Sequence, residues 1–247
     1  MNDKKFIFIA GLHRSGTSLL DQIIKSHPKI SGFQNTGVPE DEGQHLQSVY
    51  KVAKAFGGPG KFAFHSESYM NETHPLATEE NAKKLFTEWS SYLDISKKYL
   101  VEKSPPNIIR TRFLQNLFPE SKFIIILRHP IAVSFATKRW SDGSISELIE
   151  HYLLAYEAFF KDMKSLQNVH IIKYEEFILM PQETMDKIFM YLELQSISIE
   201  EKILKNINEK YFLEWEKEKE IMGKNELDNI YLKFEERVNN LGYSLIK

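Results

Sequence analysis

Short unbroken apolar runs and longer segments with helical spacing follow one another along this chain. The clearest runs are residues 6–10 and 122–127, and such runs are typical of strands buried on both faces of a parallel sheet. Two shorter strands are predicted at residues 99–101 and 169–174. Apolar residues three or four apart predict helices between the strands. The expected helices cover residues 19–27, 42–56, 78–98, 105–117, 130–139, 145–166 and 181–192, followed by a charged helical segment.

The alternation of strands and helices predicts the fold class, which is α/β, a three-layer sandwich with a central, mainly parallel sheet. Ligands bind to such sheets beyond the carboxyl ends of the strands. Residues 11–18 follow the first predicted strand and contain Gly11, Gly16 and three hydroxyl side chains. A loop of this kind directs backbone N–H groups and a helix N-terminus toward one point. We therefore expect a phosphate or sulfate group to bind there.

Composition narrows the classes of partner. The 32 Lys and Arg residues oppose 34 Asp and Glu residues, so no overall field favours nucleic acid or an anionic membrane. The absence of cysteine excludes disulfides and thiolate metal sites. No run of about 18 apolar residues occurs, so we expect a cytoplasmic protein without an integral membrane segment. The length suits one domain over residues 1–247, with helical regions around 29–98 and over 181–247.

The glycine-rich loop departs from the nucleoside triphosphate pattern that it overlaps. Gly11 and Gly16 have the spacing of a Walker A loop, but Thr17 stands where that loop has its phosphate-binding lysine. The strand over residues 122–127 ends in Arg128, where many ATP- and GTP-using enzymes have an aspartate that helps to hold Mg²⁺. An arginine there attracts phosphate and repels a divalent cation. We expect a nucleotide anion bound without metal.

At these motifs the sequence resembles the sulfotransferases that use 3′-phosphoadenosine 5′-phosphosulfate (PAPS), nearest to the bacterial and tyrosylprotein-like branch. Residues 11–18, GLHRSGTS, resemble the family's 5′-phosphosulfate loop, with His13 in place of the usual proline. Residues 128–134, RHPIAVS, resemble its 3′-phosphate motif. EKSP at residues 102–105 and KYEEF at 173–177 are similar to two further family elements. The resemblance covers residues 6–177, and no RKG-like segment is evident after it.

The resemblance implies a P-loop nucleotide-kinase-like fold, PAPS as cosubstrate, the bisphosphate PAP as product, and no metal. The residues that would bind the 5′-phosphosulfate are Arg14, Ser15, Gly16, Thr17 and Ser18. Arg128 and Ser134 would hold the 3′-phosphate, and Lys103 would lie near the transferring sulfuryl group. The region around 29–98 would bind the acceptor.

The catalytic base is expected on the segment that follows the first helix. Several branches of the family use a Glu or His there, and this chain offers Glu40, Asp41, Glu42 and His45. In a helix beginning near Asp41, Glu42 and His45 would share one face, so that one could take the acceptor proton while the other orients the acceptor. Glu42 is the favoured base, and His45 is the alternative.

The resulting prediction is transfer of a sulfuryl group from PAPS to a hydroxyl, or an amine, of a small-molecule, lipid or glycan acceptor. A Mg-dependent P-loop phosphotransferase or NTPase is one alternative, and the missing Walker lysine and aspartate argue against it. A non-catalytic PAP-binding module is the other. No motif identifies the acceptor or the oligomeric state, and no nucleic-acid partner is expected.

Overall fold

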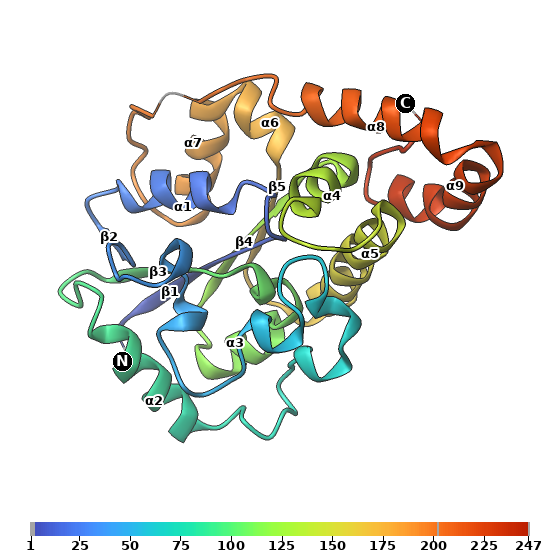
Figure 1. The fold of residues 1–247 in the computed structure, drawn as a ribbon. Helices are drawn as coiled ribbons and strands as arrows, with labels where there is room; N and C mark the ends of the chain where they lie inside the picture. Colours follow the sequence, from blue (N-terminus) through green and yellow to red (C-terminus); the bar gives the residue numbers. More distant parts are fainter. Residues whose placement is uncertain (1–2, 202, 247) are drawn as a thin grey trace.

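A parallel sheet forms the centre of the molecule (Figure 1). In the computed structural model, which describes residues 3–201 and 203–246, the sheet has five strands in the order β2-β3-β1-β4-β5. The strands are β1 Lys5–Ala10, β2 Ile30–Gly32, β3 Tyr99–Lys103, β4 Lys122–Leu127 and β5 Val169–Lys173. Each neighbouring pair is parallel, for example Ile7 opposite Val101 and Ile9 opposite Ile124. The predicted α/β fold is therefore confirmed.

Helices cover both faces of this sheet (Figure 1). Their bounds are α1 Thr17–Lys25, α2 Glu79–Ser90, α3 Thr111–Leu117, α4 Pro130–Lys138, α5 Ile145–Asp162, α6 Tyr174–Leu179, α7 Pro181–Tyr191, α8 Glu209–Met222 and α9 Lys224–Asn239. Short polar side chains fix two of the starts. Thr78 accepts the N–H of Asn81 at the start of α2, and Ser144 forms a reciprocal capping box with Glu147 at the start of α5.

The side chains of the central strand alternate between two apolar layers. Phe6 and Phe8 join the core beneath α2, α3, α4 and α5, whereas Ile7 and Ile9 join the core beneath α1, α6 and α7. All four are buried, at 2% exposure or less. Because neither face meets water, the strand is apolar at every position, which is the pattern that the sequence shows.

Two expectations for the segment after α1 are wrong. Residues 30–32, expected in a loop, form the edge strand β2, which is too short to show a periodicity. Residues 42–56 form no α-helix; they contain the 3₁₀ turns Gly43–His45 and Ala53–Phe56 joined by irregular chain. The predicted helix over 78–98 ends at Ser90, and the one over 105–117 begins as a 3₁₀ turn, Pro105–Ile109.

Two glutamine side chains replace the helical hydrogen bonds of the segment 42–56. Gln47 Nε2 donates to the carbonyls of Gln44 and Tyr50, at 3.0 and 2.8 Å, and its Oε1 accepts backbone N–H groups. Gln44 Oε1 accepts the N–H of Ala53 at 2.8 Å. The apolar residues of the segment are buried as its spacing suggested, although the backbone that carries them is irregular.

The C-terminal helices α8 and α9 form a hairpin at one end of the molecule, beside α4 and α5 (Figure 1). Their inward side chains, which include Tyr211, Trp215 and Phe234, belong to the same apolar core as the central strands. Within residues 3–201 and 203–246, the structure contains no helix with the length and apolar character needed to cross a bilayer.

Candidate active site

The loop between β1 and α1 is folded into a tight turn. Ser15 donates to the carbonyl of Leu12 from its backbone N–H, at 3.0 Å, and from its hydroxyl, at 2.7 Å. Arg14 and Gly16 have positive φ angles of 69° and 104°. Helix α1 begins directly after Gly16, and the N–H groups of its first turn have no intrahelical acceptor. The loop therefore has the form of an anion-binding site at a helix N-terminus.

Aromatic residues from two helices hold this loop in place. A Cβ on Gly16 would lie 2.5 Å from the ring of Tyr174, so only glycine fits beneath that ring. Tyr156 donates from its hydroxyl to the carbonyl of Ile126 at 2.7 Å and accepts the N–H of Leu12 at 3.4 Å. The end of β4 and the start of the loop are thus joined through one buried side chain.

A strained turn lies against the start of α1. Ser18 donates from its hydroxyl to the Glu40 carboxylate at 3.1 Å. Glu40 and Asp41 both have positive φ angles, of 53° and 48°, which is unusual for residues other than glycine. The Asp41 carboxylate accepts the backbone N–H groups of Asn35 and Thr36, at 3.0 and 2.8 Å. Asp41 therefore stabilises this turn, and the turn brings Glu42, the residue after Asp41, toward the start of α1.

Arg128 is a buried cation at the carboxyl end of β4. Its side chain is 5% exposed, and its Nη1 donates to the carbonyl of Arg14 at 2.7 Å. Nε and Nη2 both donate to Asn208 Oδ1, at 2.8 and 2.6 Å, and the guanidinium lies 4.2 Å from the centre of the Tyr174 ring. No ion pair joins it to a carboxylate in the described part of the chain. The guanidinium is therefore a buried cation that no carboxylate contacts directly.

Asn208, which precedes α8, lies between Arg128 and the carboxylate of Glu175 and hydrogen-bonds to both. Its Nδ2 donates to Glu175 Oε1 at 2.7 Å, and the same oxygen accepts the N–H of His129 at 3.0 Å. The other oxygen of Glu175 accepts the Tyr243 hydroxyl at 2.9 Å. Sequence reasoning missed Asn208 because it stands in no motif. The KYEEF segment, in contrast, was expected at a strand end, and Glu175 braces the end of β4.

Glu42 and Lys103 form a buried pair on the other side of the loop. Lys103 Nζ donates to Glu42 Oε1 at 3.3 Å and to the carbonyl of Glu40 at 3.0 Å. Glu42 Oε2 accepts from Gln44 Nε2 at 2.5 Å. Burial raises the pKa of Glu42 above its ordinary value, while Lys103 and the hydrogen bond from Gln44 oppose that rise. The pair combines a carboxylate of increased basicity with a fixed cation.

His45 lies near Glu42, but not on the expected helix face. His45 ends the 3₁₀ turn Gly43–His45, and Glu42 is the extended residue before that turn. His45 Nε2 is 3.9 Å from Glu42 Oε2, which is beyond hydrogen-bond distance. Burial and the charge of Lys103 lower the pKa of His45. Both candidates for the base are therefore close together, and the more deeply buried one, Glu42, is the one that contacts Lys103.

Glu102 is a second buried carboxyl beside this pair. It accepts hydrogen bonds from the Ser104 hydroxyl and from the Asn107 amide, and it is fully buried. Burial raises its pKa to about 7, and the charge of Glu42 adds to the rise. Ser104 Oγ also accepts the N–H of Gln44 at 3.1 Å, so the turn that carries Glu42 is attached to the end of β3. The EKSP motif thus supplies the cation Lys103, and through Ser104 it also holds the turn that follows Glu42.

Ser134 occupies a different environment from Arg128. Its hydroxyl is buried without a hydrogen-bond partner among the described residues, as are His13 Nδ1 and His151 Nε2. All three residues line a small cavity of about 10 Å³ behind the loop. Burial lowers the pKa of His13 and of His151 to about 3, so both rings are neutral. Ser134 makes no hydrogen bond with Arg128, and their shared role stays a prediction.

The predicted residues converge on one edge of the sheet, in two groups joined by the loop. Arg128 contacts the backbone of Arg14, and Ser18 contacts the turn through Glu40. The Arg14 guanidinium lies 4.6 Å from the ring centre of Trp140, an exposed residue that sequence reasoning did not select. The arrangement offers backbone N–H groups and cations for an anion, with a buried carboxylate alongside.

Known proteins with similar sequences belong to one family. The sequence profile of the sulfotransferase family matches residues 7–198. Nodulation protein NoeE of Sinorhizobium fredii is 26% identical over 152 residues, which are 57% of this chain and 33% of that protein. Protein-tyrosine sulfotransferase 2 of Gallus gallus is 21% identical over 197 residues, which are 75% of this chain and 50% of that protein. The chain thus spans a third to a half of these curated relatives.

Solved structures share the fold. A sulfotransferase domain from the curacin biosynthetic pathway superimposes with a TM-score of 0.55 over 98% of both chains, at 18% identity. A sulfotransferase from Alicyclobacillus acidocaldarius superimposes with a TM-score of 0.50 over 95% of this chain and 94% of its own, at 16% identity. Because the family profile matches residues 7–198, which are well over half of the chain, the protein belongs to the sulfotransferase family.

Proposed function

We propose that the protein transfers a sulfuryl group from PAPS to a hydroxyl group of its acceptor. The observation that carries this proposal is the buried Arg128, which is held against the loop backbone and has no carboxylate partner among the described residues. A buried cation without a counterion is costly unless an anion joins it. The 3′-phosphate of PAPS has the charge that this position favours.

The residues present fit that nucleotide. Thr17 stands in place of the Walker lysine, and the loop still offers the N–H groups of the first turn of α1. Ser134, whose buried hydroxyl has no hydrogen-bond partner in the described part of the chain, is the proposed second contact of the 3′-phosphate. When bound, PAPS supplies an activated sulfuryl group, which passes to the acceptor oxygen as its bond to the PAP oxygen breaks. In this assignment Arg14 and residues 15–18 hold the 5′ group.

Glu42 is the proposed base. Its carboxylate takes the proton that the acceptor hydroxyl loses, and burial strengthens it as a base by raising its pKa. Lys103 keeps Glu42 ionised and provides a cation close to the loop, where negative charge develops during transfer. His45 is placed to orient the acceptor, since it lies 3.9 Å from the same carboxylate.

The proposed acceptor is a small molecule, lipid or glycan with a free hydroxyl. An amine acceptor would need the same base. The names of the two curated relatives point to different contexts, nodulation and protein tyrosine, and therefore favour no single acceptor class. The proposed acceptor side consists of the irregular segment 42–56, which carries Glu42, and residues 62–77. The two segments meet where the 3₁₀ turns Ala53–Phe56 and Phe62–Phe64 are in contact.

Two alternatives make different predictions in one experiment. PAP, PAPS, ADP and ATP are titrated into the protein by calorimetry in the presence of EDTA, and transfer from labelled PAPS is measured with an acceptor panel. We expect strong preference for PAP and PAPS, together with labelled product. A Mg-dependent phosphotransferase would instead need the metal and bind ATP. A non-catalytic module would bind PAP tightly and label no acceptor, and Glu42→Gln would leave its behaviour unchanged.

A further inference from the structure

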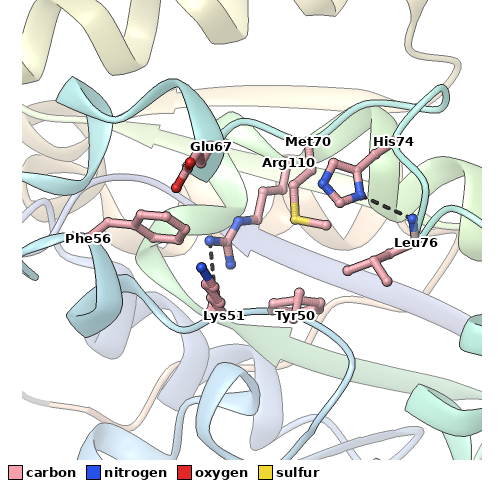
Figure 2. Close-up of a pocket in the computed structure, with 8 residues that line it drawn as sticks. All are labelled: Tyr50, Lys51, Phe56, Glu67, Met70, His74, Leu76 and Arg110. Carbon is pink, nitrogen blue, oxygen red and sulfur yellow. Dashed lines mark hydrogen bonds between the residues drawn. The ribbon is translucent and has the colours of Figure 1, made fainter.

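A pocket separate from the nucleotide loop lies between the irregular segment 42–56 and the end of the 3₁₀ turn that follows β3 (Figure 2). Its volume is about 230 Å³. Tyr50, Phe56 and Met70 are buried and give it apolar walls, and Leu76 closes one side. The volume and the walls suit a compact ring or branched aliphatic group.

Arg110 brings a positive charge into this apolar pocket. Its side chain is 1% exposed, and it donates to the carbonyls of Ser68 and Lys51, at 3.1 and 3.0 Å. The third nitrogen, Nη1, is buried and has no hydrogen-bond partner in the described part of the chain. Figure 2 shows the guanidinium among the lining side chains, and its centre lies 5.0 Å from the Tyr50 ring. An arginine remains charged even in such surroundings.

Tyr50 provides a second unused donor. Its hydroxyl is buried and, like Arg110 Nη1, has no partner among the described residues. Burial raises the pKa of Tyr50 far above its ordinary value, so the hydroxyl keeps its proton. Two unsatisfied donors on residues that line one pocket are unusual, because buried polar groups in native proteins are nearly always paired. Their simplest common partner is an acceptor group on a ligand.

The charges around the pocket set the charge of that ligand. Arg110 is the buried cation, and the exposed Lys51 lies at the rim with its Nζ 5.9 Å from the Phe56 ring. Glu67 lines the same rim and is exposed (Figure 2). A group with two negative charges would be repelled by Glu67 and would find one buried cation. A carboxylate matches one guanidinium and one hydroxyl in charge and in number of oxygens.

We propose that this pocket binds the carboxylate of a compact, apolar organic acid, with Arg110 Nη1 and the Tyr50 hydroxyl as donors. Resting on the proposed function, the acid is a part of the sulfuryl acceptor. Tyr50 follows His45 by five residues, and Gln47 ties that short segment together through the carbonyls of Gln44 and Tyr50. A ligand in the pocket is thereby placed beside the segment that carries the proposed base.

Benzoate and benzamide test the charge requirement, because the two have the same ring and nearly the same shape. Each is titrated into the full-length protein, and binding is followed by calorimetry and by the side-chain resonance of Arg110. We expect benzoate to bind at least about tenfold more tightly than benzamide and to shift the Arg110 resonance. Equal affinities, or benzoate binding without a shift at Arg110, would overturn the proposal.

Tyr50→Phe tests the donor without disturbing the fold, because the hydroxyl that it removes has no partner to lose. This variant should weaken benzoate about fivefold or more and leave benzamide unchanged. Lys51→Gln is the control, since Lys51 is an exposed cation at the same pocket, and it should change benzoate affinity by less than about twofold. If the loss in Lys51→Gln equals or exceeds that in Tyr50→Phe, the anion binds at the rim and the proposal fails.

Titration of PAP into Tyr50→Phe separates this proposal from the proposed function. We expect an unchanged PAP affinity, because Tyr50 does not contact the loop. If PAP binds the wild-type protein but benzoate shows no preference over benzamide, the carboxylate pocket alone is wrong. If benzoate binds as expected but the protein shows no affinity for PAP, the carboxylate site stands and its assignment to a sulfuryl acceptor is wrong.

Discussion

The ammonium group of Lys103 lies 3.3 Å from Glu42 Oε1, and the two side chains are only 2% and 7% exposed. The same ammonium group donates to the carbonyl of Glu40 at 3.0 Å. One cation therefore fixes both the carboxylate and the strained backbone that precedes it. Because the pair is buried, loss of the Lys103 cation alters the protonation of Glu42.

Glu42→Gln should remove the base while keeping the shape and the hydrogen bond from Lys103. Turnover with saturating PAPS should fall by about 10²- to 10⁴-fold, because general base catalysis contributes that range. PAP affinity by calorimetry should be unchanged. Glu40→Gln is the matched control: Glu40 is an exposed carboxylate close to Glu42, and glutamine still offers an oxygen to the Ser18 hydroxyl, so turnover should change little. A comparable loss in Glu40→Gln would reassign the base.

The pH dependence of turnover should report the ionisation of Glu42. The base works only when deprotonated, so turnover should fall as pH decreases through its folded-state pKa, which burial places above the ordinary value of 4.5. Lys103→Met removes the cation that opposes this rise. The acidic limb of the kcat profile should therefore move to higher pH in Lys103→Met. A limb that stays in place or moves to lower pH contradicts the assignment.

Glu102→Gln should stabilise the protein in a pH-dependent way. Burial raises the pKa of Glu102 to about 7, so between pH 4.5 and 7 the folded state binds more protons than the unfolded state, and this group reduces the free energy of unfolding as pH rises. Glutamine removes that loss. Urea unfolding should show a gain on the order of 1–3 kcal/mol at pH 8 that fades toward pH 4.

The glutamine at position 102 should also find hydrogen-bond partners. Ser104 can still donate to its oxygen, and the Asn107 Oδ1, which is buried without a partner among the described residues, can accept from its amide after Asn107 rotates. A difference between variant and wild type that is the same at pH 4 and pH 8 would show that packing, not ionisation, causes the effect.

Arg128→Gln should reduce affinity for PAP much more than for ADP. Loss of a charge-assisted contact of about 1.5–3 kcal/mol corresponds to roughly 10- to 150-fold, and only PAP carries the 3′-phosphate. Calorimetry with both nucleotides measures the ratio. Arg112→Gln serves as the control, because Arg112, on α3, pairs with Glu72 and with Asp162 at the end of α5, and the change should leave both affinities unchanged. Equal losses for PAP and ADP in Arg128→Gln would mean that Arg128 binds another group.

Gly16→Ala should damage the loop more than an ordinary glycine replacement does. Both Gly16 and Gly37 have positive φ, 104° and 82°, so alanine is strained at either position by about 1 kcal/mol. At Gly16 the new Cβ also lies 2.5 Å from the Tyr174 ring, whereas nothing lies within 4 Å at Gly37. Thermal unfolding and PAP titration should show a larger loss in Gly16→Ala. Equal effects would show that the Tyr174 contact is unimportant.

Much of the fold could be predicted because its central strands are buried on both faces. The continuous apolar runs of β1 and β4 have no other simple explanation in a chain of this composition. The segment 42–56 could not be predicted correctly, because its apolar spacing reports burial and not backbone conformation. There the side chains of Gln44 and Gln47 take the place of helical hydrogen bonds, which no periodicity reveals.

Some residues of the candidate site could be predicted from the sequence, and others could not. The loop, Arg128 and Lys103 stand in local motifs, so their proximity follows from the parallel sheet. Asn208 and Tyr156 reach the site from distant helical segments, at 80 residues from Arg128 and 144 residues from Leu12, and carry no local signal. Glu102 was visible in its motif, but its raised pKa depends on burial that only the packed structure supplies.

The C-terminal hairpin has a consequence for where this protein can be shortened. The family match ends at residue 198, yet Tyr211, Trp215 and Phe234 pack into the core that holds Phe6 and Phe8. A chain ended at the family boundary would leave that core open and would remove Asn208 from Arg128. The segment that matches the family profile is therefore shorter than the segment that folds as one unit. Expression of the shorter piece should yield an aggregating protein.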